Sequence, residues 1–329
     1  MHAFYRENRD SCRYTVDVKV IFFGSPAFAL PSLASLRDAG HTLALVVSQP
    51  GKPVGRSGEV ADPPVAARAK SLGIQVFQPP TLKDDAAIAL LASAGADMFV
   101  VAAYGKIFSQ RVLDLPRLGC VNVHGSLLPR WRGASPVQAA ILAGDAVTGV
   151  SIMKMEAGMD TGPVYTMRET RIGEEESAEE LGARLAVMGA DALRETLLFL
   201  EGERGAQISL PPSPQDSSLA TTCPKITRED ARVDWTRPAA ELVRRSRAFT
   251  PWPGLFTLRR NARVKLSRLS LEAEGESPPG TILEAGPRLV VACGGEAVSI
   301  GTLQAEGRRA LPAAEFVRGE RVAAGEHWG

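Results

Sequence analysis

Short apolar runs alternate with amphipathic stretches over the first 125 residues of the chain. The run at residues 18–24 is typical of a buried strand, and the stretch after it offers Ser25 as a helix cap and Gly40 as a helix end. The alternation then repeats, with strands predicted at 42–48, 74–77, 97–103 and 120–125 and helices at 63–73 and 84–95. Near-continuous apolar strands separated by helices predict an α/β fold with a doubly wound, mostly parallel sheet and helices on both faces.

The pattern changes in the last third of the chain. A final long helix is predicted at 178–201, and the segment "SLPPSPQDSS" after it has the composition of an extended linker. A short strand and an amphipathic helix are expected within 231–249, followed by strands at the spacing of a small OB-like β-barrel, at 255–260, 263–272, 280–285, 288–293 and 297–304. We therefore expect a disordered tail at 1–17, an α/β domain at 18–203, a linker at 204–223 and a C-terminal β-barrel domain at 224–329.

Composition argues against several classes of protein. The turn after the first strand, "GSPAFA", lacks the G-x-G-x-x-G fingerprint, so a nicotinamide or flavin cofactor is not expected. No apolar stretch reaches the roughly 18 residues of a membrane helix, and the acidic residues in the first 17 positions argue against a transit peptide, so we expect a cytoplasmic protein without a membrane partner. Four cysteines stand far apart with no C-x-x-C pair, which predicts neither a zinc site nor a disulfide framework: Cys12, Cys120, Cys223 and Cys293.

Charge is divided unevenly along the chain. The net charge is only +1, but residues 224–329 carry 17 basic and 13 acidic side chains, whereas residues 1–223 carry 21 and 24. Ten basic residues lie between Arg232 and Arg268, and only Asp234 and Glu241 offset them. Such an excess can bind a polyanion if it folds onto one face. The alternative is an ordinary solvated surface of mixed charge.

Two polar side chains interrupt the apolar strand predicted at 120–125. Asn122 and His124 are two positions apart near its carboxyl end, so on an extended chain they point to the same face. In a doubly wound sheet the ligand crevice lies outside the carboxyl ends of the strands. Asp160, in the turn "AGMDTG", supplies a carboxylate that could complete the set. The alternatives are a hydrogen-bonded core histidine and an Asx-type turn residue.

The segment that begins at Asn122, "NVHGSLLPRWRGASPVQAAILAGDAVTGVSIMKMEAGMDTGPV", resembles the signature of formyltransferases that use 10-formyltetrahydrofolate. Segments outside it, among them "QPGKPVGR", "FVVAAYGKIF", "KITREDARVDW" and "RAFTPWPG", are similar to the methionyl-tRNA formyltransferase group of that superfamily, and the resemblance covers the chain from Val18 on. The chain departs from the group at Ala27, Gly51, Lys52 and Ser151, where an acidic residue, Asp, Arg and Thr are usual. Lys52 matters most, because its loop resembles the inserted loop with which the group grips tRNA.

The resemblance implies roles for the matched positions. Asn122, His124 and Asp160 match the catalytic set of the family. The folate is expected to lie against four consecutive residues, Ser126, Leu127, Leu128 and Pro129. The loop that contains Tyr104 and Gly105 is expected to close over the pteridine of the folate. Contacts to tRNA are expected from the basic residues Lys52, Arg56, Arg244, Arg245 and Arg247. The implied partners are initiator methionyl-tRNA and the folate co-substrate, no metal is implied, and the chain is expected to be a monomer.

The implied reaction moves a formyl group from 10-formyltetrahydrofolate to the methionine amine of charged initiator tRNA. A tetrahedral oxyanion forms on the way, which calls for a hydrogen-bond donor and a proton route. The side-chain amide of Asn122 is suited to be the hydrogen-bond donor, and His124 could donate to the oxyanion or relay the proton. Asp160 could stabilise a protonated imidazole or take the amine proton through water, so the base is either His124 or Asp160. Two other functions are open: N-formylation of an amino-sugar nucleotide with the same catalytic set, and a tRNA-binding module whose α/β half is only a scaffold.

Overall fold

The structure is a computed structural model that describes residues 18–54, 58–202, 211–272 and 277–329. The expected tail at 1–17 lies outside these ranges. One compact unit falls within Met1–Val123 and Ala190–Pro212, and the other within His124–Gly189 and Ser213–Gly329. These bounds differ from the division into 18–203 and 224–329, which stays a prediction.

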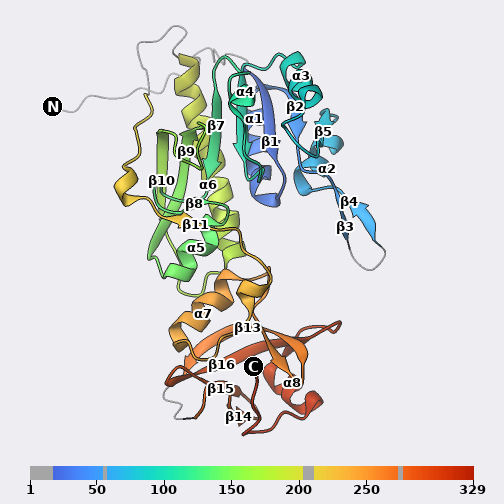
Figure 1. Cartoon of the computed structure of the whole chain (residues 1–329), viewed down its shortest axis with the longest axis vertical. Coiled ribbons are helices and arrows are strands. Elements are labelled where there is room, and N and C mark those ends of the chain that lie inside the picture. The colour runs from blue at the N-terminus through green and yellow to red at the C-terminus, as the bar shows by residue number, and fades with distance from the viewer. Residues whose placement is uncertain (1–17, 55–57, 203–210, 273–276) are drawn as a thin grey trace, which may run out of the picture. The chain divides into compact units, whose positions relative to one another are not determined.

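A seven-stranded sheet has the order β10-β9-β7-β6-β1-β2-β5 (Figure 1). Its strands are β1 Lys19–Gly24, β2 Thr42–Val47, β5 Val76–Phe77, β6 Met98–Ala102, β7 Cys120–His124, β9 Val147–Lys154 and β10 Val164–Arg171. The pairs β1–β2, β1–β6, β6–β7 and β2–β5 are parallel, and β9–β10 is antiparallel at one edge. The predicted mostly parallel sheet is confirmed, and the strands β9 and β10 are additional to those that the apolar pattern predicted.

Helices connect the parallel strands, as crossover connections require. These connections contain α1 Leu30–Asp38, α2 Pro64–Ser71, α3 Asp85–Ser93 and α4 Gln110–Leu113. Two further helices belong to the other edge of the sheet: α5 Pro136–Ala143 precedes β9, and α6 Ala178–Gly202 follows β10. In α1, α2 and α5 a proline occupies one of the first two positions, where its missing N–H leaves no hydrogen bond unmade. Every residue of β6 is buried, which explains why this strand is a continuous apolar run in the sequence. None of the helices in the described ranges is both long and apolar enough to cross a membrane.

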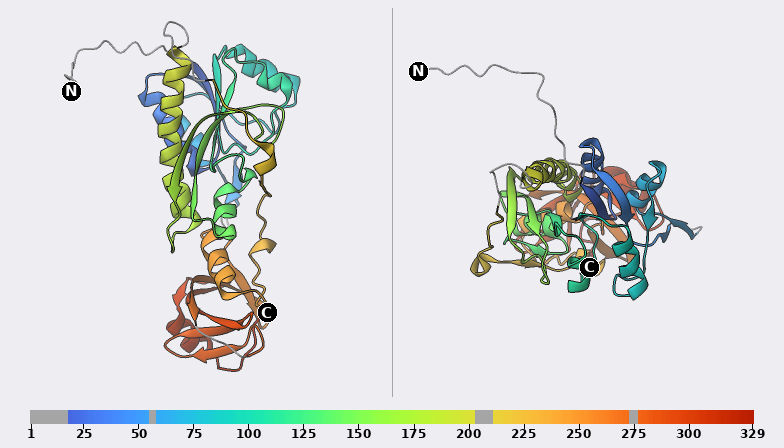
Figure 2. Two further views of the ribbon diagram at one scale, coloured as in Figure 1. Left: turned by 90° about the vertical axis from the view of Figure 1, so that its left-hand side faces the viewer. Right: turned by 90° about the horizontal axis from the view of Figure 1, so that it is seen from above.

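The C-terminal strands form a second, antiparallel sheet in the order β12-β13-β16-β15-β14, with β17 paired to β16. The strands are β12 Phe256–Arg259, β13 Ala262–Glu272, β14 Ile282–Ala285, β15 Leu289–Cys293, β16 Glu296–Ala305 and β17 Leu311–Pro312, and the helices are α7 Ala239–Ala248 and α8 Ala313–Glu320. Figure 2 shows the curl of this sheet in orange and red. The predicted small barrel is confirmed as a curled half-barrel. The short strand predicted before α7 is reduced to one bridge, between Arg232 and Phe256.

Two short strand pairs complete the fold. β3 Lys52–Val54 pairs with β4 Glu59–Ala61 as an antiparallel hairpin. β8 Arg132–Gly133 pairs in parallel with β11 Thr222–Cys223. The second pair joins residues about 90 positions apart in the sequence, and it brings part of the expected linker beside the loop that follows β7.

Candidate active site

The carboxyl end of β7 carries the first two predicted residues. Val121 and Val123 are buried, whereas Asn122 between them is half-buried. His124 is the last residue of the strand and is 5% exposed. Because side chains alternate along a strand, Asn122 and His124 point to the same face. The strand and its polar end therefore lie where the sequence pattern placed them.

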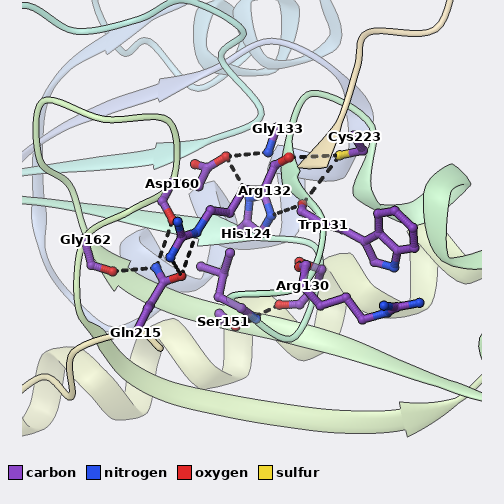
Figure 3. A network of polar contacts seen from close by, with 12 residues as sticks. His124, Arg130, Trp131, Arg132, Gly133, Ser151, Asp160, Gly162, Gln215 and Cys223 are labelled. Atoms are coloured by element: carbon purple, nitrogen blue, oxygen red, sulfur yellow. Dashed lines mark hydrogen bonds and ion pairs between the residues drawn. The ribbon is translucent and has the colours of Figure 1, made fainter. Parts of the chain in front are cut away.

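The ring of His124 is oriented by a backbone carbonyl. Its Nε2 atom lies 3.0 Å from the carbonyl oxygen of Trp131 (Figure 3). A carbonyl oxygen can only accept a hydrogen bond, so Nε2 must carry a hydrogen and donate it. The other ring nitrogen, Nδ1, lies 3.7 Å from Oδ2 of Asp160. Nδ1 is therefore the ring atom that the Trp131 contact leaves available, and it lies beside a carboxylate.

Asp160 lies in the turn between β9 and β10 and has a left-handed backbone, with φ 52°. The backbone N–H of Gly133 donates to Oδ2 of Asp160 at 2.9 Å, and this is the oxygen that faces His124. Gly133 has a φ of 124°, and a Cβ atom there would collide with the carbonyl oxygen of Cys223. Only glycine therefore lets the chain bring this N–H to the carboxylate. The side chain of Asp160 is 18% exposed, so a substrate can still reach it.

The loop after β7 contains the four residues predicted to contact folate. Ser126 and Leu128 are buried: the hydroxyl of Ser126 donates to the carbonyl of Arg130 at 2.6 Å, and Leu128 packs in an apolar cluster that includes Met153. Leu127 and Pro129 keep part of their surface exposed. A ligand on this loop would therefore contact backbone groups and the exposed parts of Leu127 and Pro129. The folate role of the loop stays a prediction.

Tyr104 and Gly105 follow β6. The ring of Tyr104 is 1% exposed and packs edge-on against Phe23 at 5.5 Å between ring centroids. Burial raises the pKa of Tyr104 to about 12, and the hydroxyl has no hydrogen-bond partner among the described residues. Gly105 has a φ of 77°, and a Cβ atom there would lie 3.1 Å from Nε2 of Gln49, which donates to the carbonyl of Tyr104 at 2.8 Å. The Tyr104 side chain thus belongs to the aromatic core, and its folate contact stays a prediction.

The arrangement at the end of β7 combines an amide, a histidine with one exchangeable ring nitrogen and a carboxylate. An amide N–H can stabilise a developing oxyanion, and a histidine beside a carboxylate can carry a proton. These are the two needs of acyl transfer to an amine. Within the described ranges, no group of three or more His, Cys, Asp or Glu side chains could hold a metal ion.

Both halves of the chain match models of one enzyme family. A formyl transferase model matches residues 18–197, and a formyl transferase C-terminal domain model matches residues 225–321. A curated methionyl-tRNA formyltransferase of Thiobacillus denitrificans is 46% identical over 315 residues, which are 95% of this chain and 100% of the relative. The chain belongs to the methionyl-tRNA formyltransferase family.

Solved structures of more distant proteins share the fold of this family member. HypX from Aquifex aeolicus in complex with tetrahydrofolic acid aligns with a TM-score of 0.63 at 17% identity, over 92% of this chain and 47% of that one. The N-formyltransferase from Helicobacter canadensis, in complex with folinic acid and dTDP-3-aminofucose, aligns with a TM-score of 0.62 at 15% identity, over 86% of this chain and 98% of that one. At these identities the likeness concerns the fold alone.

The hairpin predicted to contact tRNA is described only in part. Lys52, which stands where the methionyl-tRNA formyltransferase group usually has Arg, is exposed on β3. Arg56 lies outside the described residues. The tRNA role of both residues stays a prediction.

The three α7 arginines predicted to contact tRNA are half-buried and bound to other parts of the chain. Arg244 donates from Nε to the carbonyl of Leu142 at 3.2 Å, and Arg247 donates from Nη1 to the carbonyl of Gly173 at 3.0 Å. Arg245 donates to the carbonyl of Asp230, and burial lowers the pKa of both Arg245 and Arg247. Each side chain thus has a packing role in addition to the tRNA contact, which stays a prediction. Other basic residues of the same run are exposed, among them Arg232, Arg260 and Arg268.

A polar cluster beside His124 was not expected from the sequence. Nε1 of Trp131 donates to Oδ2 of Asp145 at 2.7 Å, and Nη2 of Arg130 donates to Oδ1 of the same carboxylate at 2.5 Å. The guanidinium of Arg130 also stacks over the Trp131 ring at 4.5 Å from its centroid. The cluster holds the residue whose carbonyl orients His124. The alternation of basic and aromatic residues in "PRWRG" is the feature of the sequence that could have indicated it.

Ser151 departs from the family pattern but keeps the hydroxyl group that this position uses. The Ser151 hydroxyl donates to the carbonyl of Ser126 at 2.7 Å and accepts from the N–H of Leu128 at 3.1 Å. Threonine, the usual residue there, has the same hydroxyl group. The two hydrogen bonds fix the loop after β7, so the substitution preserves the function of this position in the fold.

Replacing Ser151 by alanine is expected to lower the free energy of unfolding by about 1–3 kcal/mol, because a buried N–H and a buried carbonyl lose their partner. Ser151→Thr keeps the hydroxyl and should stay close to the native stability. Urea denaturation of the three proteins measures the difference. Equal stability of the alanine and threonine variants would show that this hydroxyl does not hold the loop.

Proposed function

We propose that the protein transfers the formyl group of 10-formyltetrahydrofolate to the amine of methionine on initiator methionyl-tRNA, a step of translation initiation in the cytoplasm. The observation that carries the proposal is the Asn–His pair at the end of β7, with Asp160 beside His124. It occurs in a chain that is 46% identical to a methionyl-tRNA formyltransferase over 95% of this chain and 100% of the relative. A folate donor is further supported by HypX, whose structure contains tetrahydrofolic acid.

Each residue takes a role that its surroundings allow. The methionine amine attacks the formyl carbon, a new C–N bond forms, and the carbonyl oxygen becomes an oxyanion to which the Asn122 amide donates. The bond from the formyl carbon to N10 of the folate then breaks. One proton leaves the amine and one must reach N10, and Nδ1 of His124 is the ring atom that can carry it, because Nε2 donates to Trp131. The carboxylate of Asp160 lies 3.7 Å from Nδ1 and so forms the next group on the proton route.

The main rival is N-formylation of an amino-sugar nucleotide. The Helicobacter canadensis structure contains an amino-sugar nucleotide, dTDP-3-aminofucose, but that protein shares only 15% sequence identity with this chain. The methionyl-tRNA formyltransferase of Thiobacillus denitrificans shares 46%. The test is to incubate the protein with 10-formyltetrahydrofolate and, in separate reactions, initiator methionyl-tRNA or a dTDP-amino sugar. We expect formylmethionine on the tRNA and no formylated sugar; the reverse outcome would assign the chain to the sugar enzymes.

The exposed basic residues of the C-terminal half give a second test of the tRNA substrate. Replacing Arg260 or Arg268 by glutamine should lower the slope of log Kd against log salt by about 1 per lost phosphate contact, with unchanged stability. Arg245→Gln should instead lower stability, because its guanidinium is bound within the protein. Filter binding at several salt concentrations and thermal denaturation provide the two readouts.

The matched control is Arg318→Gln, which removes an exposed charge from α8, outside the basic run. It should leave both tRNA affinity and its salt dependence near the native values. If Arg260→Gln and Arg268→Gln behave like this control, the basic run is an ordinary solvated surface and does not bind phosphate.

A further inference from the structure

Residues 213–223, which we call the strap, run beside the candidate active site. At one end the N–H and carbonyl of Ser213 pair with those of Val164 in β10, both at 2.8 Å. At the other end Thr222 and Cys223 form β11 beside β8. The two family models match residues 18–197 and 225–321, so neither covers the strap. Backbone hydrogen bonds thus fix a segment that composition marks only as a linker.

Gln215 in the middle of the strap uses its whole amide for hydrogen bonds to the site (Figure 3). Its Nε2 atom donates to the carbonyls of Asp160 at 2.8 Å and Gly162 at 2.6 Å. Its Oε1 atom accepts from Nε and Nη2 of Arg132 at 3.0 and 2.8 Å. Two donors and two acceptor positions are all that a glutamine side chain offers. Gln215 therefore has the orientation of its amide fixed from both ends.

These contacts act on the backbone of Asp160 itself. Asp160 has a left-handed backbone, a conformation that residues with a Cβ atom adopt less readily than glycine and that contacts from the surroundings can stabilise. Gln215 holds the carbonyl of Asp160 and the carbonyl two residues later. Arg132, which orients Gln215, directly precedes Gly133, whose N–H binds the Asp160 carboxylate. Backbone and carboxylate of Asp160 are thus fixed by one connected set of hydrogen bonds.

The far end of the strap acts on His124 through Trp131. The hydroxyl of Thr221 accepts from the N–H of Trp131 at 2.9 Å, and the thiol of Cys223 donates to the carbonyl of Trp131 at 3.5 Å. That carbonyl is the acceptor for Nε2 of His124. Burial raises the pKa of the Cys223 thiol, so it keeps its hydrogen at neutral pH. Both partners of the His124–Asp160 pair are therefore held by the strap.

We infer that Gln215 is a positioning residue for formyl transfer, and that the strap is part of the catalytic site as well as a connection along the chain. Gln215 would not touch the substrates; it would keep the Asp160 carboxylate at the distance from Nδ1 of His124 that the proton route needs. This inference rests on the proposed function for its effect on turnover. The geometry that carries it is the closed set of hydrogen bonds from Arg132 through Gln215 to Asp160.

The test uses two substitutions in the full chain. Gln215→Met has a similar length and makes no hydrogen bond, while Gln215→Glu keeps the contact to Arg132 but turns an oxygen toward the carbonyls of Asp160 and Gly162. Both should lower kcat about 10- to 100-fold with little change of KM for folate or tRNA, because a small displacement of a catalytic group costs rate and leaves binding intact. The pH profile of kcat should also change, because the carboxylate would no longer be held at the same distance from Nδ1 of His124.

Asp216→Ala is the matched control, because Asp216 is the next residue of the strap and its carboxylate binds only Ser218 in the following turn, among the contacts described. It should keep kcat and the pH profile. A readout that needs no substrate is the nitrogen NMR signal of the His124 ring, which reports where its protons lie. The signal should change in Gln215→Met and stay native in Asp216→Ala.

The two proposals fail separately. If the native protein forms no formylmethionine, the proposed function is wrong, and the NMR signal still tests whether Gln215 positions Asp160. If the native protein is active and Gln215→Met keeps both its kcat within two-fold and the native NMR signal, the positioning role is overturned. If Gln215→Met loses its fold, which a low melting temperature would show, Gln215→Glu with its retained Arg132 contact decides by the same two readouts.

Discussion

Replacement of His124 by alanine is expected to lower kcat by about 10²- to 10⁴-fold, the range that a positioned acid or base contributes. His124 is the only titrating side chain that the structure places both at the end of β7 and beside Asp160, among the residues described. Its Nε2–H is committed to the carbonyl of Trp131, so the loss of the ring removes the one exchangeable nitrogen of the site. The KM values should change little, because the buried ring offers small contact area to a substrate. Steady-state formylation of methionyl-tRNA gives both constants.

His41→Ala is the control for this experiment, since His41 lies just before β2 and not among the site residues. It should retain native kcat. A His124→Ala variant that folds and turns over as fast as the His41→Ala variant would remove His124 from the mechanism, and with it the proton route through Nδ1.

The second large effect is expected at Asn122. Removing its amide should lower kcat by about 100- to 1,000-fold, as loss of one oxyanion donor does in other acyl-transfer enzymes. Asn122 shares the face of β7 with His124 and is half-buried, so its amide can meet a substrate at the strand end. Asn122→Asp should be at least as slow, because a carboxylate at this position repels an oxyanion. The rate of the chemical step under saturating substrates is the quantity to compare.

Asn261→Gly provides the matched control for Asn122. Asn261 is exposed in the turn between β12 and β13 with a φ of 63°, a conformation that glycine also accepts. Its replacement should change neither kcat nor the melting temperature. If Asn122→Ala is as active as this control, another group stabilises the oxyanion and the assignment of Asn122 is wrong.

The fold could be predicted from the sequence wherever burial produces a simple pattern. The strands β1 and β6 are almost wholly buried, so each is an apolar run that can be recognised without a structure, and β7 is such a run interrupted by Asn122 and His124. β10 escaped prediction because only part of it is buried, and its exposed charged residues Arg168, Glu169 and Arg171 end the apolar run. β9 is almost wholly buried, but its sequence "VTGVSIMK" mixes apolar residues with Thr, Gly and Ser. The hydrophobic signal is therefore clear for the central strands and weak for the antiparallel edge.

The site was only partly predictable for a related reason. Asn122 and His124 could be placed because a strand fixes their direction. Asp160 was a candidate as a carboxylate in a tight turn, and the resemblance to a family assigned it to the catalytic set. Gln215 could not be found, because a glutamine between Pro214 and Asp216 is typical of a linker, and its importance comes from hydrogen bonds to residues over 50 positions away. Composition alone would allow a separate catalytic half to end near residue 210. Such a cut removes the strap, so we expect it to disturb Asp160 as well as tRNA binding.

The basic run illustrates the limit of charge counting. Ten basic residues between Arg232 and Arg268 suggest an open positive face. In the structure Arg259 is 5% exposed and paired with Glu320 and Glu326, and the three α7 arginines are bound to backbone carbonyls. A sequence cannot show which cations are used for packing, because the acceptors are backbone carbonyls or distant acids. The exposed basic residues of the run are therefore the ones to test as contacts to a polyanion.

Formylation of methionyl-tRNA by the side chains at the end of β7 can be followed in a single turnover, in which excess protein with bound 10-formyltetrahydrofolate is mixed with initiator methionyl-tRNA and formylmethionine is measured over time. The native protein should formylate the tRNA completely, and His124→Ala should reach the same final extent at a rate lower by about 10²- to 10⁴-fold. Absence of formylmethionine with the native protein, or equal rates for the two proteins, would show that these side chains do not perform this reaction.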